Sequence, residues 1–94
     1  MLINCLYDEN EYADIIFIPD FIKDTEKLQN DFFKWIFNNP SYFKEINGIK
    51  VCSYGTEDFV EWINRTFELK DIEISKIIKK NVDIRNSENQ SLYF

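Results

Sequence analysis

The chain has 94 residues, which is enough for one domain with a modest hydrophobic core and too few for two. Hydrophobic residues make up 45% of it and charged residues 30%, a balance that is typical of a folded protein and excludes a disordered one. The formal net charge of −6 opposes binding to nucleic acid phosphates and to anionic lipid. It favours a basic protein as partner, and the alternative is that the acidity only keeps the protein soluble.

The beginning of the chain predicts two strands. Residues 2–7 form a short apolar segment, and residues 13–18 contain a nearly continuous apolar run that suits a strand buried on both faces. The acidic stretch between them has the composition of a turn. Pro19 ends the second strand, because proline has no N–H to donate to a neighbouring strand.

A first helix is predicted after this strand, beginning at Asp24 or Thr25, since either side chain can cap the free amides. Apolar residues at helical spacing form a core-facing stripe: Leu28, Phe32, Trp35 and Ile36. Phe33 and Phe37 lie off this stripe, which predicts either a second layer of the core or anchors for a partner.

The centre of the chain predicts a tight hairpin. Asn47-Gly48 suits a type I′ turn, because both central residues of that turn need a positive φ. Aromatic and β-branched residues on both sides of the turn are typical of paired strands. Helical patterns precede and follow the hairpin, so we expect it to be the platform that both helices cover.

The second helix is predicted over residues 56–68, with Thr56 as its N-cap. Its apolar residues gather on one face and its acidic residues on the other. Residues 71–84 fit a helix by spacing and a strand by their isoleucine content, and we predict a short helix. Residues 86–91 are polar, so we predict that residues 86–94 form a frayed tail; the alternative is that Leu92, Tyr93 and Phe94 dock on a partner or in a groove.

Together these elements predict a single α+β domain over residues 1–94. We expect a small, mostly antiparallel sheet with two main helices packed on it, in the order β-β-α-β-β-α, followed by the short C-terminal helix. The chain lacks a basic signal-peptide start and any apolar run near the ~20 residues that span a bilayer, so we expect a cytoplasmic protein with reduced cysteines.

The composition offers little for catalysis. The chain has no histidine, which removes the commonest general base and most zinc sites. Cys5 and Cys52 lie in apolar, strand-like contexts without an activating neighbour or metal-type spacing. No glycine-rich phosphate-binding loop occurs. We therefore predict no catalytic residue, no metal and no cofactor, and the enzymatic alternative is a small enzyme that uses carboxylates alone.

The acidity is concentrated in two segments. Residues 1–22 hold five acidic and no basic side chains, and residues 56–68 hold four acidic side chains against one arginine. If the two segments lie side by side, they form one negative patch that would steer a basic protein into contact. The predicted partner-binding residues are Asp8, Glu9, Glu11, Asp14, Glu57, Asp58, Glu61 and Glu68.

In its size, acidity, lack of catalytic residues and richness in Ile, Asn, Lys and Phe, the whole chain resembles the immunity proteins of bacterial toxin–immunity systems, including contact-dependent growth inhibition. This resemblance implies tight, antitoxin-like binding of one cognate toxin domain, often a nuclease. Two alternatives stay open: a phage-encoded inhibitor of a host defence complex, and an obligate oligomer subunit whose aromatic side chains are buried on assembly.

Overall fold

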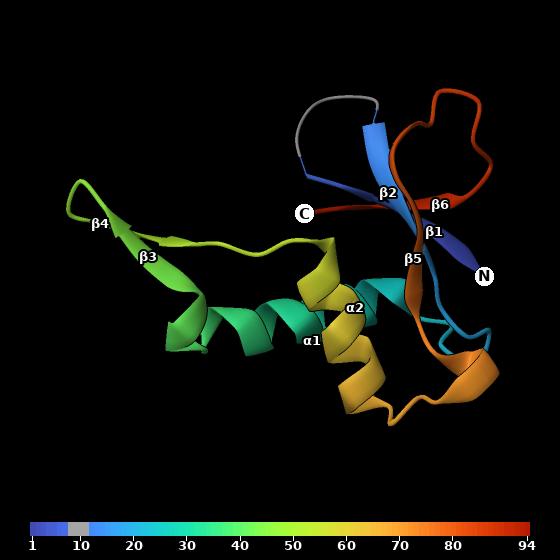
Figure 1. Cartoon of the computed structure of the whole chain (residues 1–94), viewed down its shortest axis with the longest axis horizontal. Helices are drawn as coiled ribbons and strands as arrows, with labels where there is room; N and C mark the ends of the chain where they lie inside the picture. Colours follow the sequence, from blue (N-terminus) through green and yellow to red (C-terminus); the bar gives the residue numbers. More distant parts are fainter. Residues whose placement is uncertain (8–11) are drawn as a thin grey trace.

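The computed structural model describes residues 1–7 and 12–94, and these form a mixed α+β fold with two helices, a four-stranded sheet and a two-stranded sheet (Figure 1). The helices are α1 (Thr25–Phe37) and α2 (Thr56–Thr66). The strands are β1 (Leu2–Leu6), β2 (Tyr12–Phe17), β3 (Phe43–Ile46), β4 (Ile49–Cys52), β5 (Lys76–Asp83) and β6 (Gln90–Tyr93). Two short 3-10 helices are η1 (Pro40–Tyr42) and η2 (Asp71–Glu73). The predicted α+β class and the order of elements as far as α2 are confirmed.

The main sheet has the strand order β5-β2-β1-β6 and is mostly antiparallel. β1 and β5 both run antiparallel to β2, whereas β6 runs parallel to β1. Successive strand residues point to opposite faces, so Ile3, Cys5 and Ile16 share one face of the sheet. All three are fully buried in the same core as Phe32 of α1 and Phe59 of α2. Both helices therefore cover this face of the main sheet.

The helix α1 follows its predicted pattern closely. Leu28, Phe32 and Ile36 are buried, as the apolar stripe predicted. Of the two candidate caps, Asp24 holds the position: its carboxylate accepts a hydrogen bond from the backbone N–H of Lys27 at 3.0 Å.

The predicted N-cap of α2 is wrong by one residue. The cap is Gly55, whose backbone N–H donates to the carboxylate of Asp58 at 2.9 Å. Thr56 is the first helical residue and is 1% exposed. Its hydroxyl forms hydrogen bonds with the side chains of Tyr7 and Asp14 and so does not cap the helix. The side chains of Phe59, Trp62 and Ile63 are buried and fix α2 to the core.

The C-terminal short helix is also a wrong prediction, since residues 76–83 form the eight-residue strand β5. β5 pairs antiparallel with β2. The backbone N–H and C=O groups of β5 therefore form hydrogen bonds across the sheet and not within a helix. The β-branched residues Ile77 and Val82 are half-buried, which suits a strand at the edge of a sheet.

Residues 86–94 do not form the predicted frayed tail. After β5 the chain returns on the face of the sheet opposite the helices, where Asn4 of β1 holds it: Nδ2 of Asn4 donates to Oγ of Ser87 at 3.1 Å. The chain then forms β6, and Phe94 continues the ladder by donating its N–H to the carbonyl of Leu6 at 2.7 Å. The ring of Phe94 stacks on Tyr7, with the centroids 5.2 Å apart.

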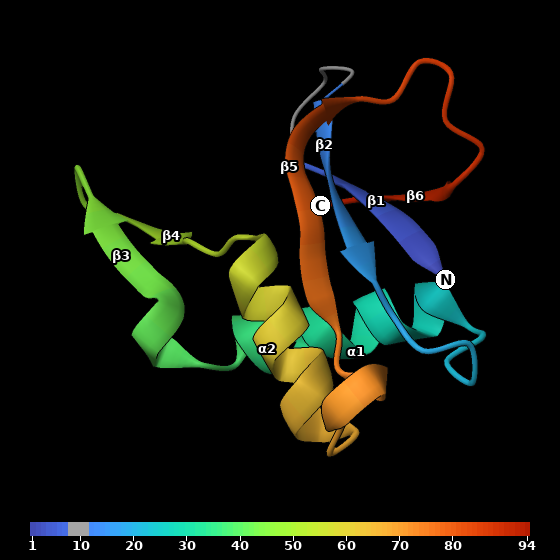
Figure 2. The same cartoon turned by 45° about the vertical axis from the view of Figure 1, so that its right-hand side comes forward.

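The hairpin forms as predicted but not where expected. Asn47 and Gly48 have φ values of 52° and 79°, as a type I′ turn requires. However, β3 and β4 form a separate two-stranded sheet that extends away from the body of the molecule, so the main sheet and not the hairpin is the platform for the helices (Figure 2). We call residues 43–52 the β3–β4 arm. Its apolar residues Ile46, Ile49 and Val51 are 54%, 66% and 42% exposed.

Candidate binding surface

The predicted partner-binding residues fall into three groups in the structure. Asp8, Glu9 and Glu11 lie outside the described residues. Asp14 lies in β2 and is half-buried. The other four belong to α2 or to its C-terminal end: Glu57, Asp58, Glu61 and Glu68.

Asp14 holds three elements together and is not a free surface carboxylate. Its Oδ2 lies 2.5 Å from Oγ1 of Thr56 at the start of α2. Its Oδ1 accepts the backbone N–H of Asn81 in β5 at 3.1 Å. Asn81 has a φ of 56°, at a point where the register between β2 and β5 shifts, so its N–H is turned from the ladder to the carboxylate.

Tyr7 extends this network, because its hydroxyl lies 2.8 Å from Oγ1 of Thr56. Thr56 has a single hydroxyl proton, and the carboxylate of Asp14 is the stronger acceptor. We therefore assign that proton to Asp14, which leaves the Tyr7 hydroxyl to donate to Thr56. Burial, as the main cause, raises the pKa of Tyr7 well above its ordinary value, so this hydroxyl stays protonated.

The network joins two residues, Tyr7 and Thr56, that each precede acidic residues in the sequence. Tyr7 immediately precedes residues 8–11, and Thr56 immediately precedes Glu57. The hydrogen bond between Tyr7 and Thr56 thus ties the start of α2 to the end of β1.

Within α2, the fold engages two of the four predicted acids. Glu57 forms an ion pair with Lys80 of β5, in which both side chains are more than half exposed. Asp58 accepts the N–H of Gly55 and is half-buried. Glu61 and Glu68 are exposed, and neither forms an ion pair within the part of the chain that the structure describes.

Glu68 also terminates α2 in an unusual conformation for a glutamate. Its φ is 53°, the left-handed region that glycine usually occupies after a helix. The N–H of Leu69 donates to the carbonyl of Asn64 at 2.9 Å, and that of Glu68 to the carbonyl of Arg65 at 3.4 Å. These two bonds form a Schellman motif, which places the Glu68 side chain just beyond the helix end.

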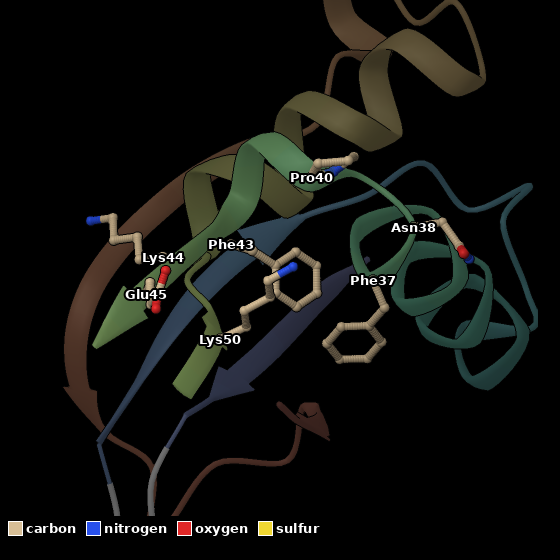
Figure 3. A pocket seen from close by; sticks show the side chains of 7 residues that line it. All are labelled: Phe37, Asn38, Pro40, Phe43, Lys44, Glu45 and Lys50. Carbon is tan, nitrogen blue, oxygen red and sulfur yellow. The ribbon is translucent and has the colours of Figure 1, made fainter. Parts of the chain in front are cut away.

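A second surface lies between α1 and the β3–β4 arm. Phe33 packs in the aromatic cluster with Tyr54 and Phe94, and Phe37 stacks on Phe33 with the centroids 5.5 Å apart. Phe33 therefore belongs to the second core layer, whereas Phe37 is 50% exposed. Phe37 and Phe43 point into a groove of about 480 Å³ (Figure 3). Its lining residues are Phe37, Asn38, Pro40, Phe43, Lys44, Glu45 and Lys50.

The exposure of the arm was not predicted from the sequence. The signal was present: Ile46 and Ile49 flank the turn directly, with charged residues at Lys44, Glu45 and Lys50 around them. A hairpin buried under two helices would not carry three charges in eight strand positions.

The thiols of both cysteines have pKa values above the ordinary value. Burial, and to a lesser extent the charge of Asp14, raises the pKa of the Cys5 thiol to about 12. Partial burial also raises the pKa of Cys52. Across residues 1–7 and 12–94, no three His, Cys, Asp or Glu side chains lie close enough to hold a metal ion. None of the helices in this part of the chain is long and apolar enough to cross a membrane.

The comparisons with known proteins add no relative. No family model matches the chain, and neither a curated protein nor a solved structure matches it.

Proposed function

We propose that this chain is a non-enzymatic, acidic binding protein that neutralises a basic protein partner, in the manner of an immunity protein that blocks a cognate bacterial toxin. The observation that carries the proposal is the outer face of α2, where exposed glutamates lie on a helix that is firmly fixed to the core. The proposed location is the cytoplasm, where the two free cysteines would stay reduced.

The rigidity of α2 supports a binding role. Phe59 and Ile63 are fully buried and Trp62 is 6% exposed, so the helix cannot rotate without opening the core. Its glutamates are thus presented in a fixed geometry, and a partner does not have to bear the cost of ordering the backbone. Fixed charges of one sign at a surface accelerate association with a partner of the opposite sign.

Glu57 and Lys80 are compatible with this role. An exposed ion pair contributes only about 0–1 kcal/mol to stability, so a cationic side chain of the partner could replace Lys80 at little cost. Glu61 and Glu68 need no such exchange. We therefore propose Glu57, Glu61 and Glu68 as contact residues, and Asp14 and Asp58 as residues that hold α2 in place.

The test is a pull-down of the tagged protein from lysate of its native cell, at low and at high salt, with mass spectrometry of the retained proteins. The informative variant is Glu61→Gln combined with Glu68→Gln. The matched control is Glu26→Gln combined with Glu88→Gln, which changes the net charge by the same amount at exposed positions on α1 and in the connection between β5 and β6.

We expect one basic protein to be retained at low salt, to be lost with the α2 variant and to be kept with the control. Purified partner should then lose its activity on addition of this chain. Retention that is equal for both variants would contradict a site on α2, and retention of an acidic or neutral protein would contradict the electrostatic basis of the proposal.

The gene neighbourhood separates the two inhibitor hypotheses. A toxin gene directly upstream would support an immunity protein, whereas a prophage context would support an inhibitor of a host defence complex. The third hypothesis, an oligomer subunit, is favoured by a different observation, the exposed arm.

A further inference from the structure

The β3–β4 arm is a separate two-stranded sheet with unpaired strand edges and an exposed apolar face. Opposite residues of the hairpin share a face, so Ile46, Ile49 and Val51 lie together with Lys44 on one side. Nothing in the described chain covers this side, since the three apolar side chains are 42–66% exposed. A two-stranded hairpin is marginally stable alone, and further strands would stabilise it.

We propose that the arm is a self-association surface, through which two copies of this chain pair antiparallel along β4 to form a four-stranded intermolecular sheet. The charge distribution favours a second copy over the basic partner proposed for α2. The arm carries two lysines and one glutamate, a net charge of +1, on a chain of −6. A positive arm gives no attraction to a basic protein, whereas the edge of β4 can pair with its own copy in a register that places no like charges opposite each other.

The hydrogen-bond pattern of the hairpin identifies the free groups. Ser53 donates its N–H to the carbonyl of Tyr42 at 2.8 Å, and Ile46 faces Ile49 across the two-residue turn. Hydrogen-bonded and non-hydrogen-bonded residue pairs alternate in an antiparallel ladder. Lys44 and Val51 therefore also form a hydrogen-bonded pair, with their N–H and C=O groups directed at each other between β3 and β4. The N–H and C=O groups of Lys50 and Cys52 therefore point outward along the free edge of β4.

The edge of β3 is a poor alternative. Pairing two copies about Lys44 places like charges opposite each other, and pairing about Glu45 does the same, which destabilises a sheet. Pairing about Phe43 would need residues 40–42 to be extended, but they form η1.

The edge of β4 allows one register within the strand. Pairing about Lys50 opposes two lysines, and pairing about Cys52 requires residues 53 and 54, which lie beyond the strand. If the two-fold axis of the dimer passes beside Val51, Lys50 of one copy lies opposite Cys52 of the other. The two Val51 side chains then lie opposite each other at the axis. A symmetric pairing of this kind closes as a dimer and does not propagate.

The first test is sedimentation velocity of the full chain over a concentration series, where we expect a monomer–dimer equilibrium. Val51→Lys opposes two cations on the axis and should raise the dimer dissociation constant by about tenfold or more. Ile72→Lys is the matched control, because Ile72 is 92% exposed and lies outside the arm. Circular dichroism should show that both variants keep the fold, since neither position is buried.

The second test is a disulfide crosslink in a Cys52→Ser background. The Cα atoms of a non-bonded antiparallel pair are about 4.5 Å apart, which a disulfide can bridge. Val51→Cys should therefore form a covalent dimer on mild oxidation, whereas Ile46→Cys on β3 should not.

A wild-type chain that stays monomeric at every concentration would overturn the proposal, as would equal dissociation constants for Val51→Lys and Ile72→Lys. Efficient crosslinking of the native Cys52 with its own copy, without crosslinking of Val51→Cys, would overturn the register. The proposal is independent of the function proposed for α2, because the arm variants leave the glutamates of α2 unchanged.

Discussion

The carboxylate of Asp14 accepts the hydroxyl proton of Thr56 at 2.5 Å, and this single hydrogen bond joins the middle of β2 to the first residue of α2. Asp14 also receives the N–H of Asn81 in β5. A half-buried carboxylate with two donors from different elements is expected to contribute more to stability than to binding.

We therefore predict that Asp14→Ala lowers the free energy of unfolding by about 2–3 kcal/mol, because the Asn81 amide loses its acceptor and the Thr56 hydroxyl keeps only Tyr7 as a partner. Asp14→Asn keeps one acceptor oxygen and should cost about half as much. Urea unfolding measures both. The control Glu61→Ala removes an exposed acid and should stay within about 0.5 kcal/mol of the wild type. Equal losses for Asp14→Ala and Glu61→Ala would show that the network does not stabilise the fold.

The end of α2 gives a prediction of the opposite sign. Glu68 holds a left-handed φ of 53°, which is costly for a residue with a Cβ atom. Glu68→Gly should raise the free energy of unfolding by about 0.5–1 kcal/mol, with an unchanged urea m-value. Glu68→Ala removes the same charge but keeps the Cβ atom, so it should give no such gain. A gain of equal size with alanine would assign the effect to the lost charge and not to the backbone.

The local features of this fold were predictable from the sequence, and the non-local ones were not. The turn at Asn47-Gly48 and the stripe of α1 depend on neighbouring residues alone, and both formed as predicted. β5 and β6 depend on pairing with strands that lie about sixty to ninety residues away in sequence, and the polar composition of residues 86–91 carries no trace of that pairing.

The candidate site shows the same division. The spacing of Glu57 and Glu61 predicted that both lie on the exposed face of α2, because helical periodicity is local, whereas Glu68 lies beyond the end of the helix. The internal role of Asp14 was missed, since its partners Thr56 and Asn81 are distant in the sequence. The same contact explains the misplaced cap: a threonine before a helix usually caps it, but here its hydroxyl is taken by Asp14.

Alkaline pH should destabilise the protein through Cys5. The folded state raises the pKa of this thiol from 9.0 to about 12, mainly by burial and in part by the charge of Asp14. The contribution of the neutral thiol to the free energy of unfolding is fully present below pH 9. It is lost as the pH rises towards 12, at up to about 1.4 kcal/mol per pH unit. Cys5→Ala should flatten the fall in the free energy of unfolding above pH 9, whereas Cys52→Ala should leave it largely unchanged. The same slope in both variants would assign the alkaline transition to other groups, among them Tyr7, whose pKa is also raised.

The connection between β5 and β6 should depend on Asn4. This side chain is 1% exposed: its Nδ2 donates to Ser87 at 3.1 Å, and its Oδ1 accepts from Asn89 at 3.5 Å. Asn4→Ala should cost about 1–3 kcal/mol, because it removes the hydrogen bonds that join the connection to β1. Hydrogen exchange provides the decisive measurement: protection should fall first in residues 84–94, while the amides of α1 and α2 keep their protection. Ser91→Ala removes only the longer bond of 3.4 Å and should have a smaller effect. A uniform loss of protection over the whole chain would show instead that Asn4 supports the core globally and that β6 does not open on its own.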